Sequence, residues 1–119
     1  MARADLEDRW DVDRGLEATR KRVLRFLDDT DMKVLEEDDE KIVAKQGSQL
    51  MTRLLGGWFV SPTRLPKRAT IRLRETPEGT RVKAVIEESL GFGILDPILK
   101  EKYEKYFDEW MDDLADAVK

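Results

Sequence analysis

The C-terminal segment constrains the fold most, because it predicts a long helix with one broad apolar face. Asp96 and Pro97 suit the N-cap and the first position of a helix. Large apolar residues then recur at helical spacing: Leu99, Tyr103, Tyr106, Phe107, Trp110, Met111, Leu114 and Val118. Each large side chain left in water would forfeit about 1.5–3 kcal/mol of burial free energy. The helix must therefore lie across another apolar surface.

An antiparallel sheet is the surface that the sequence offers. Apolar and polar residues alternate with period two on both sides of a turn that has Pro77 at its second position and Gly79 at its fourth. Similar patterns occur earlier in the chain, and a charged tip at Asp39-Glu40 separates two of them. The expected strands span residues 4–12, 32–38, 41–47, 49–55, 67–75 and 81–88.

A first helix is expected between the first two strands. Its apolar positions recur at helical spacing at Leu16, Val23, Leu24 and Leu27. Asp13 is predicted to cap this helix, which should end near Asp28-Asp29. We therefore expect a single α+β domain over residues 1–119, in which an antiparallel sheet of about five to six strands carries an N-terminal helix and a long C-terminal helix.

Composition limits the chemistry of the protein. The 119 residues include no Cys and no His, which removes disulfides, thiolate nucleophiles, the commonest general base and the commonest transition-metal ligand. We therefore lean against an enzyme and expect neither a cofactor nor a metal site. Charged residues make up 40% of the chain and Asn is absent, a composition typical of a thermophile.

Apolar runs are too short for a membrane-spanning helix, which needs about 20 residues. The first residues also lack the apolar core of a signal peptide. We expect a soluble, cytoplasmic protein.

The least polar stretch is LLGGWFV, Leu54 to Val60. In a strand, this sequence would place apolar side chains on both faces. Gly56-Gly57 could form a two-residue hairpin turn or a bulge. The stretch could instead lie at a rim, with one side toward a ligand or a second protomer. Pro62 and Pro66 place the following loop at an edge or at the mouth of the sheet.

The order of elements, with Gly91-Phe92-Gly93 directly before the final helix, resembles the helix-grip fold of the START and Bet v 1-like superfamily. The resemblance is one of topology, and no motif can be carried over from it. It implies a cavity between the sheet and the final helix, where a hydrophobic or amphipathic small molecule or lipid would bind. The Gly56–Pro66 loop and the Gly91–Gly93 hinge would gate this cavity. The expected ligand-binding residues are Leu54, Trp58, Phe59, Phe92, Tyr103, Phe107 and Trp110. An ordinary filled core would use the same kinds of side chain.

Two other functions stay open. The LLGGWFV rim could form a homodimer or bind a protein partner. A basic hairpin surface could bind an anion or nucleic acid through Arg68, Arg72, Arg74, Arg81 and Lys83. We consider nucleic acid unlikely for this acidic chain, with its net charge of -4, and the basic stretch lacks aromatic residues for stacking. The alternative for this surface is a solvated face that forms ion pairs with Glu36, Asp38 or Glu87.

Glu87 and Glu88 are adjacent near the end of the last expected strand. Because successive side chains of a strand point to opposite faces, one carboxylate should point toward the helix-covered side. A buried carboxylate could act as an acid or base. No second catalytic group is recognisable, so solvation of the strand end is the favoured interpretation.

Overall fold

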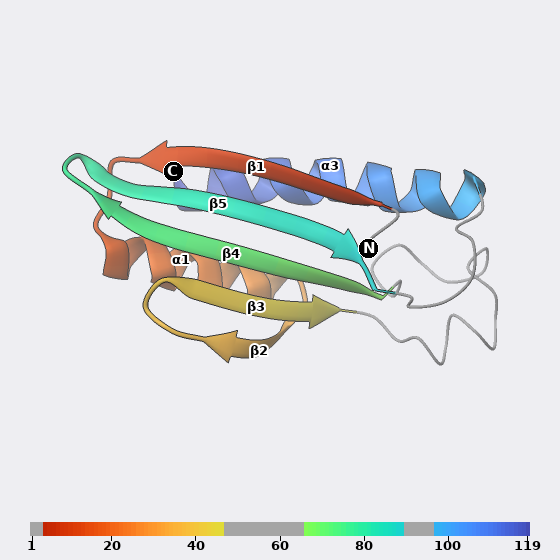
Figure 1. The fold of residues 1–119 in the computed structure, drawn as a ribbon, viewed down its shortest axis with the longest axis horizontal. Coiled ribbons are helices and arrows are strands. Elements are labelled where there is room, and N and C mark those ends of the chain that lie inside the picture. The colour runs from red at the N-terminus through yellow and green to blue at the C-terminus, as the bar shows by residue number, and fades with distance from the viewer. Residues whose placement is uncertain (1–3, 47–65, 90–96) are drawn as a thin grey trace.

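The computed structural model describes residues 4–46, 66–89 and 97–119. As the sequence predicts, these residues form an α+β fold in which two helices cover one face of a five-stranded antiparallel sheet (Figure 1). In chain order the elements are β1 (Asp5–Val12), α1 (Leu16–Asp29), β2 (Lys33–Glu37), β3 (Lys41–Gln46), β4 (Lys67–Thr76), β5 (Gly79–Glu88) and α3 (Pro97–Val118).

The strands lie in the order β1-β5-β4-β3-β2, so β1 pairs with the last strand and β2 forms the other edge. The alternation in the sequence identifies all five of these strands, with small shifts at their ends. The strand expected over residues 49–55 lies outside the described residues.

The β4-β5 hairpin has the predicted two-residue turn, with Pro77 and Glu78 between the paired residues Thr76 and Gly79. Gly79 adopts a φ of 155°, and an added Cβ would lie 2.1 Å from the carbonyl oxygen of Val12. Glycine is therefore required here, because the turn lies directly against the end of β1.

The predicted capping role of Asp13 is wrong. Helix α1 begins at Leu16, its N-cap is Gly15, and no side chain caps it. The Thr80 hydroxyl on β5 donates a hydrogen bond to the Arg14 carbonyl oxygen at 2.8 Å. This hydrogen bond holds the backbone at Arg14 outside the helix, so helix α1 begins after Arg14 and Gly15.

The core lies between the sheet and the two helices. The predicted apolar face of α3 is buried there at Tyr103, Phe107, Trp110, Met111, Leu114 and Val118. Helix α1 contributes Phe26, whose ring meets that of Trp110 edge-on at a centroid distance of 5.4 Å. Neither helix in the described part of the chain is long and apolar enough to span a bilayer.

Candidate functional site

The inner face of the sheet becomes polar at one end. At the end away from the β4-β5 turn, Gln46, Lys67 and Glu88 lie side by side on β3, β4 and β5. Their exposed fractions are only 7%, 0% and 7%. We call these three residues the buried polar row. The next inward row consists of Ala44, Ala69 and Ile86, so the polar groups are concentrated at this end.

Lys67 is at the centre of the buried polar row. Its Nζ donates a hydrogen bond to Gln46 Oε1 at 2.8 Å and lies 4.3 Å from the centroid of the Tyr106 ring on α3. Burial disfavours the charged form of the amine and lowers the pKa of Lys67 from 10.5 to about 7. Near neutral pH, Lys67 can therefore gain or lose a proton.

Gln46 connects three elements at this end of the fold. Its Oε1 also accepts a hydrogen bond from the Tyr106 hydroxyl at 3.1 Å, and its Nε2 donates to the carbonyl oxygen of Thr30, the C-cap residue of α1. Burial raises the pKa of Tyr106, although the hydrogen bond to Gln46 opposes this shift. Tyr106 therefore stays a neutral hydroxyl donor near pH 7.

The Tyr103 hydroxyl connects α3 to the start of β4. It is fully buried and donates a hydrogen bond of 2.7 Å to the carbonyl oxygen of Pro66, which directly precedes Lys67. The Tyr103 and Phe107 rings lie 5.6 Å apart, so apolar surface adjoins this hydrogen bond. The end of the sheet thus combines buried polar groups with aromatic side chains.

Only part of the predicted ligand-binding set lies in the described structure. Tyr103, Phe107 and Trp110 are exposed by 0%, 1% and 2% and belong to the hydrophobic core. The buried Trp110 Nε1 has no hydrogen-bond partner within residues 4–46, 66–89 and 97–119. The other predicted residues, Leu54, Trp58, Phe59 and Phe92, lie outside the described residues, as do the Gly56–Pro66 loop up to residue 65 and the Gly91–Gly93 hinge.

Sequence reasoning missed Lys67 and Gln46 but not the carboxylate beside them. Glu88 points to the helix-covered side, as predicted for one member of the Glu87-Glu88 pair. The position of Lys67 along its strand could have predicted that it is buried. Lys67 is two and four residues from Ala69 and Ile71, so its side chain lies on the same inward face of the strand.

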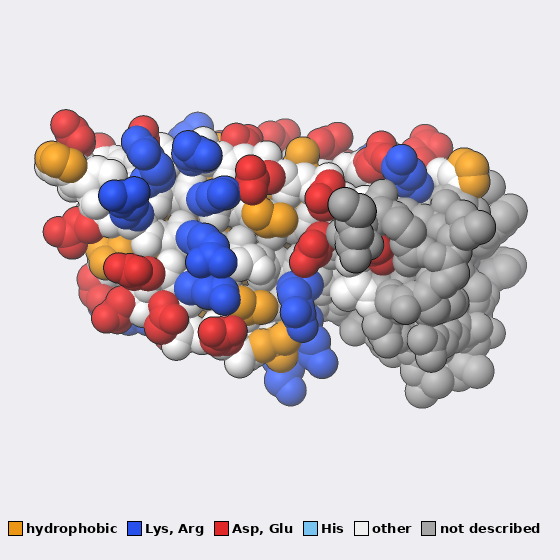
Figure 2. Space-filling model, viewed as in Figure 1, with side chains coloured by type: hydrophobic (Ala, Val, Ile, Leu, Met, Phe, Trp, Pro, Cys, Tyr) orange, Lys and Arg blue, Asp and Glu red, His pale blue; other side chains and the backbone are white. Residues whose placement is uncertain are grey.

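The opposite face of the sheet carries the predicted anion-binding residues. Arg72 lies opposite Lys83, and Arg74 lies opposite Arg81, across the β4-β5 pair. Arg68 is on the same face, four residues along β4 from Arg72, and is paired in register with Glu87. Figure 2 shows Lys and Arg side chains gathered on this open face, with acidic side chains around them.

Within the residues that the structure describes, the expected ion pairs of these arginines with Glu36, Asp38 or Glu87 do not form. Glu36 instead lies 3.9 Å from Lys41, while an Asp38 carboxylate oxygen accepts the backbone N–H groups of Glu40 and Lys41 at 2.8 Å each. These acids are engaged close to their own positions at the β2-β3 turn. Within the described part of the chain, Arg72 and Arg74 form no ion pair.

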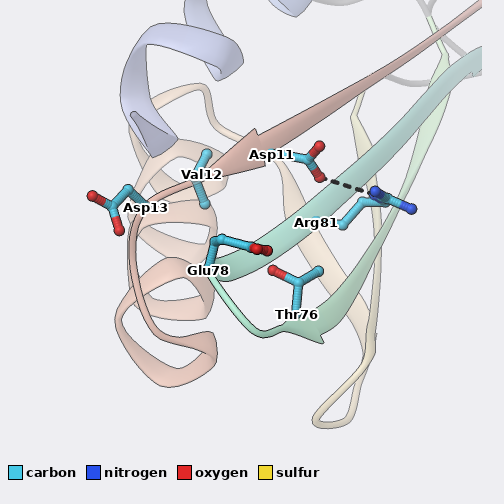
Figure 3. Close-up of a pocket in the computed structure, with 6 residues that line it drawn as sticks. All are labelled: Asp11, Val12, Asp13, Thr76, Glu78 and Arg81. Atoms are coloured by element: carbon cyan, nitrogen blue, oxygen red, sulfur yellow. Dashed lines mark hydrogen bonds and ion pairs between the residues drawn. The ribbon is translucent and has the colours of Figure 1, made fainter.

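A surface hollow of about 350 Å³ lies at the turn end of the sheet (Figure 3). Its lining residues are Asp11, Val12, Asp13, Thr76, Glu78 and Arg81. An ion pair of 2.9 Å joins Arg81 to Asp11, whereas Asp13 points away from this pair. The Arg81 guanidinium lowers the pKa of the Asp11 carboxyl, so Asp11 is ionised near pH 7. Among the described residues, no group of three or more carboxylates is arranged to hold a metal ion.

Comparisons with known proteins give similarity of fold. No protein-family model matches the sequence, and no curated protein matches it. Protein MLL2253 from Mesorhizobium loti is similar in structure, with a TM-score of 0.59, 11% identity and 96% of each chain covered. Protein NE0264 from Nitrosomonas europaea has a TM-score of 0.55 and 13% identity, covering 97% of this chain and 94% of its own. Protein CV1439 from Chromobacterium violaceum has a TM-score of 0.50 and 13% identity, with 97% of each chain covered. At these identities, the likeness shows the α+β fold alone.

Proposed function

We propose that the protein binds an amphipathic small molecule or lipid at the helix-covered end of the sheet, with the polar group of the ligand beside Lys67. The observation that carries this proposal is the buried polar row. Burying polar groups costs free energy unless each finds a partner, and here three of them are concentrated at one end of a face whose other buried residues, apart from Thr80, are apolar. Binding pockets commonly combine mainly apolar walls with a few such polar groups.

The positive charge of a protonated Lys67 favours an anionic head group, such as a carboxylate. The Lys67 ammonium carries three N–H donors and gives one of them to Gln46, whereas the Tyr106 and Tyr103 hydroxyls already donate to Gln46 and to the Pro66 carbonyl oxygen. The apolar side chains beside them, including Ile86 and Phe107, suit the hydrocarbon part of the same molecule. The topological resemblance to helix-grip proteins supports a ligand between the sheet and the final helix.

Isothermal titration calorimetry with decanoate tests the proposal. We expect decanoate to bind at pH 6.5, where Lys67 is largely protonated, and 1-decanol to bind more weakly because it lacks the charge. Lys67→Met should weaken decanoate binding by about tenfold or more, which corresponds to the loss of one charge-assisted contact of about 1.4 kcal/mol or more.

Lys45→Met is the matched control. Lys45 lies beside Gln46 on the same strand, but its exposed side chain points to the open face of the sheet. Its replacement should leave decanoate affinity unchanged. The proposal fails if decanoate does not bind, or if the two lysine variants lose affinity equally.

A further inference from the structure

The open face of the sheet carries an unbroken row of cations. Arg9, Lys83, Arg72 and Lys41 lie side by side on β1, β5, β4 and β3. We call these four residues the outer cation row. With strands about 4.8 Å apart, the row is about 14 Å long. Arg81 and Arg74 lie opposite each other one step further along the same face.

This arrangement is unfavourable to the isolated protein. Like charges directly opposite each other on neighbouring strands repel, and the outer cation row contains three such pairs in succession. Exposed ion pairs relieve only part of this: Lys83 lies 3.6 Å from Glu7, and Lys41 lies 3.9 Å from Glu36. Arg9 and Arg72 form no ion pair with any residue that the structure describes. An external anion would remove the repulsion.

The shape of the charged surface favours a narrow, linear anion. Glu7 and Glu36 lie on the neighbouring row on one side, and Asp11 pairs with Arg81 on the other. A membrane or a duplex would bring further anions against these carboxylates. At the β3 end, a hollow of about 380 Å³ lined by Asp38, Glu40, Lys41, Arg72, Leu73 and Arg74 continues the row.

We propose that the outer cation row binds a linear inorganic polyphosphate. Arginine presents a planar fork of donors that matches phosphate oxygens, and every phosphate of such a chain is charged. An extended acidic peptide would place carboxylates on one side only about every 6.8 Å, wider than the strand spacing. Single-stranded nucleic acid needs stacking partners, but the aromatic side chains of β1, α1 and α3 pack against the core. This site is on the other face of the sheet from Lys67.

Titration of the whole protein with short-chain inorganic polyphosphate tests the proposal. The double variant Arg72→Gln/Arg74→Gln should lose about tenfold or more in affinity, and its remaining binding should depend less steeply on salt concentration. The single variant Arg9→Gln, at the edge strand, should show a smaller loss. Because these substitutions remove repulsion, the unfolding temperature of each variant should equal or exceed that of the wild type.

Lys21→Gln/Arg25→Gln is the matched control, since it removes two exposed cations from α1 and should leave polyphosphate binding unchanged. The proposal is overturned if polyphosphate does not bind at low salt, or if both double variants lose affinity equally. It is also overturned if oligothymidylate or oligoglutamate of equal charge binds the wild type as tightly, because the surface would then attract polyanions in general.

Discussion

At the scale of the residue, the buried amine of Lys67 makes stability depend on pH. The pKa of Lys67 is about 7 in the folded protein, against about 10.4 for an unfolded chain. Below pH 7 both states hold the proton, so the full cost of burying the charge applies. Between the two pKa values the unfolded state binds more protons, so the free energy of unfolding rises with pH.

Lys67→Met removes this titration and should change the pH profile. Between pH 7 and pH 9, the free energy of unfolding of the wild type should rise by about 2 kcal/mol relative to that of the variant. Urea denaturation at several pH values measures the difference. Lys45→Met should follow the wild-type profile, and parallel profiles for wild type and Lys67→Met would show that the buried amine does not titrate in this range.

The inward position of Lys67 could be predicted from the sequence, but its partners could not. Lys67 alternates in step with Ala69 and Ile71, which places it on the inner face of the sheet. A lysine side chain is ordinarily expected in solvent, so this pattern is easily overlooked. The contacts with Gln46 and Tyr106 depend on strand register and on the placement of α3, which alternation alone does not determine.

At the scale of the element, Gly79 couples the β4-β5 hairpin to the end of β1. Gly79→Ala should lower the free energy of unfolding by about 2 kcal/mol or more, because the new Cβ would collide with the Val12 carbonyl oxygen and the φ is unfavourable for alanine. Chemical denaturation measures this loss.

Gly15→Ala is the control for the hairpin, because an added Cβ there meets nothing within 4 Å and the φ is -63°. Its effect should stay within about 1 kcal/mol, the usual size of a change at a helix N-cap. Equal losses in the two variants would contradict the assigned contact between the hairpin turn and β1.

The elements show where local sequence rules suffice. Alternation predicted β4 and β5, and helical spacing predicted α3, because burial on one face fixes these patterns. The start of α1 was wrong because local rules favoured Asp13, whereas a contact between Thr80 and Arg14, distant in sequence, delays the helix until after Gly15.

At the scale of the whole molecule, the sheet places different chemistry on its two faces. The buried residues of its inner face are apolar except for the buried polar row and Thr80, and its open face carries the outer cation row. The sequence predicted the basic residues of the β4-β5 hairpin. It did not predict that Arg9 and Lys41 lie in the same row as Arg72 and Lys83. That prediction requires the pairing register of β1 and β3, which the sequence does not give.

The ligand proposal requires Lys67 to be protonated when an anion is bound beside it. Among the described residues, Glu88 lies opposite Lys67 in strand register and Tyr106 contacts it, and burial raises the pKa of Tyr106, so this tyrosine stays neutral near pH 7. A carboxylate bound beside Lys67 should favour the charged amine and raise its pKa. Decanoate affinity should consequently fall as pH rises above 7.

The most direct measurement is an NMR titration of the Lys67 side chain in the free protein and in protein saturated with decanoate. We predict a midpoint near pH 7 in the free protein and a midpoint higher by about one unit or more with decanoate, since one unit corresponds to about 1.4 kcal/mol of added interaction. A midpoint near 10.5 in the free protein, or the same midpoint with and without decanoate, would contradict the account.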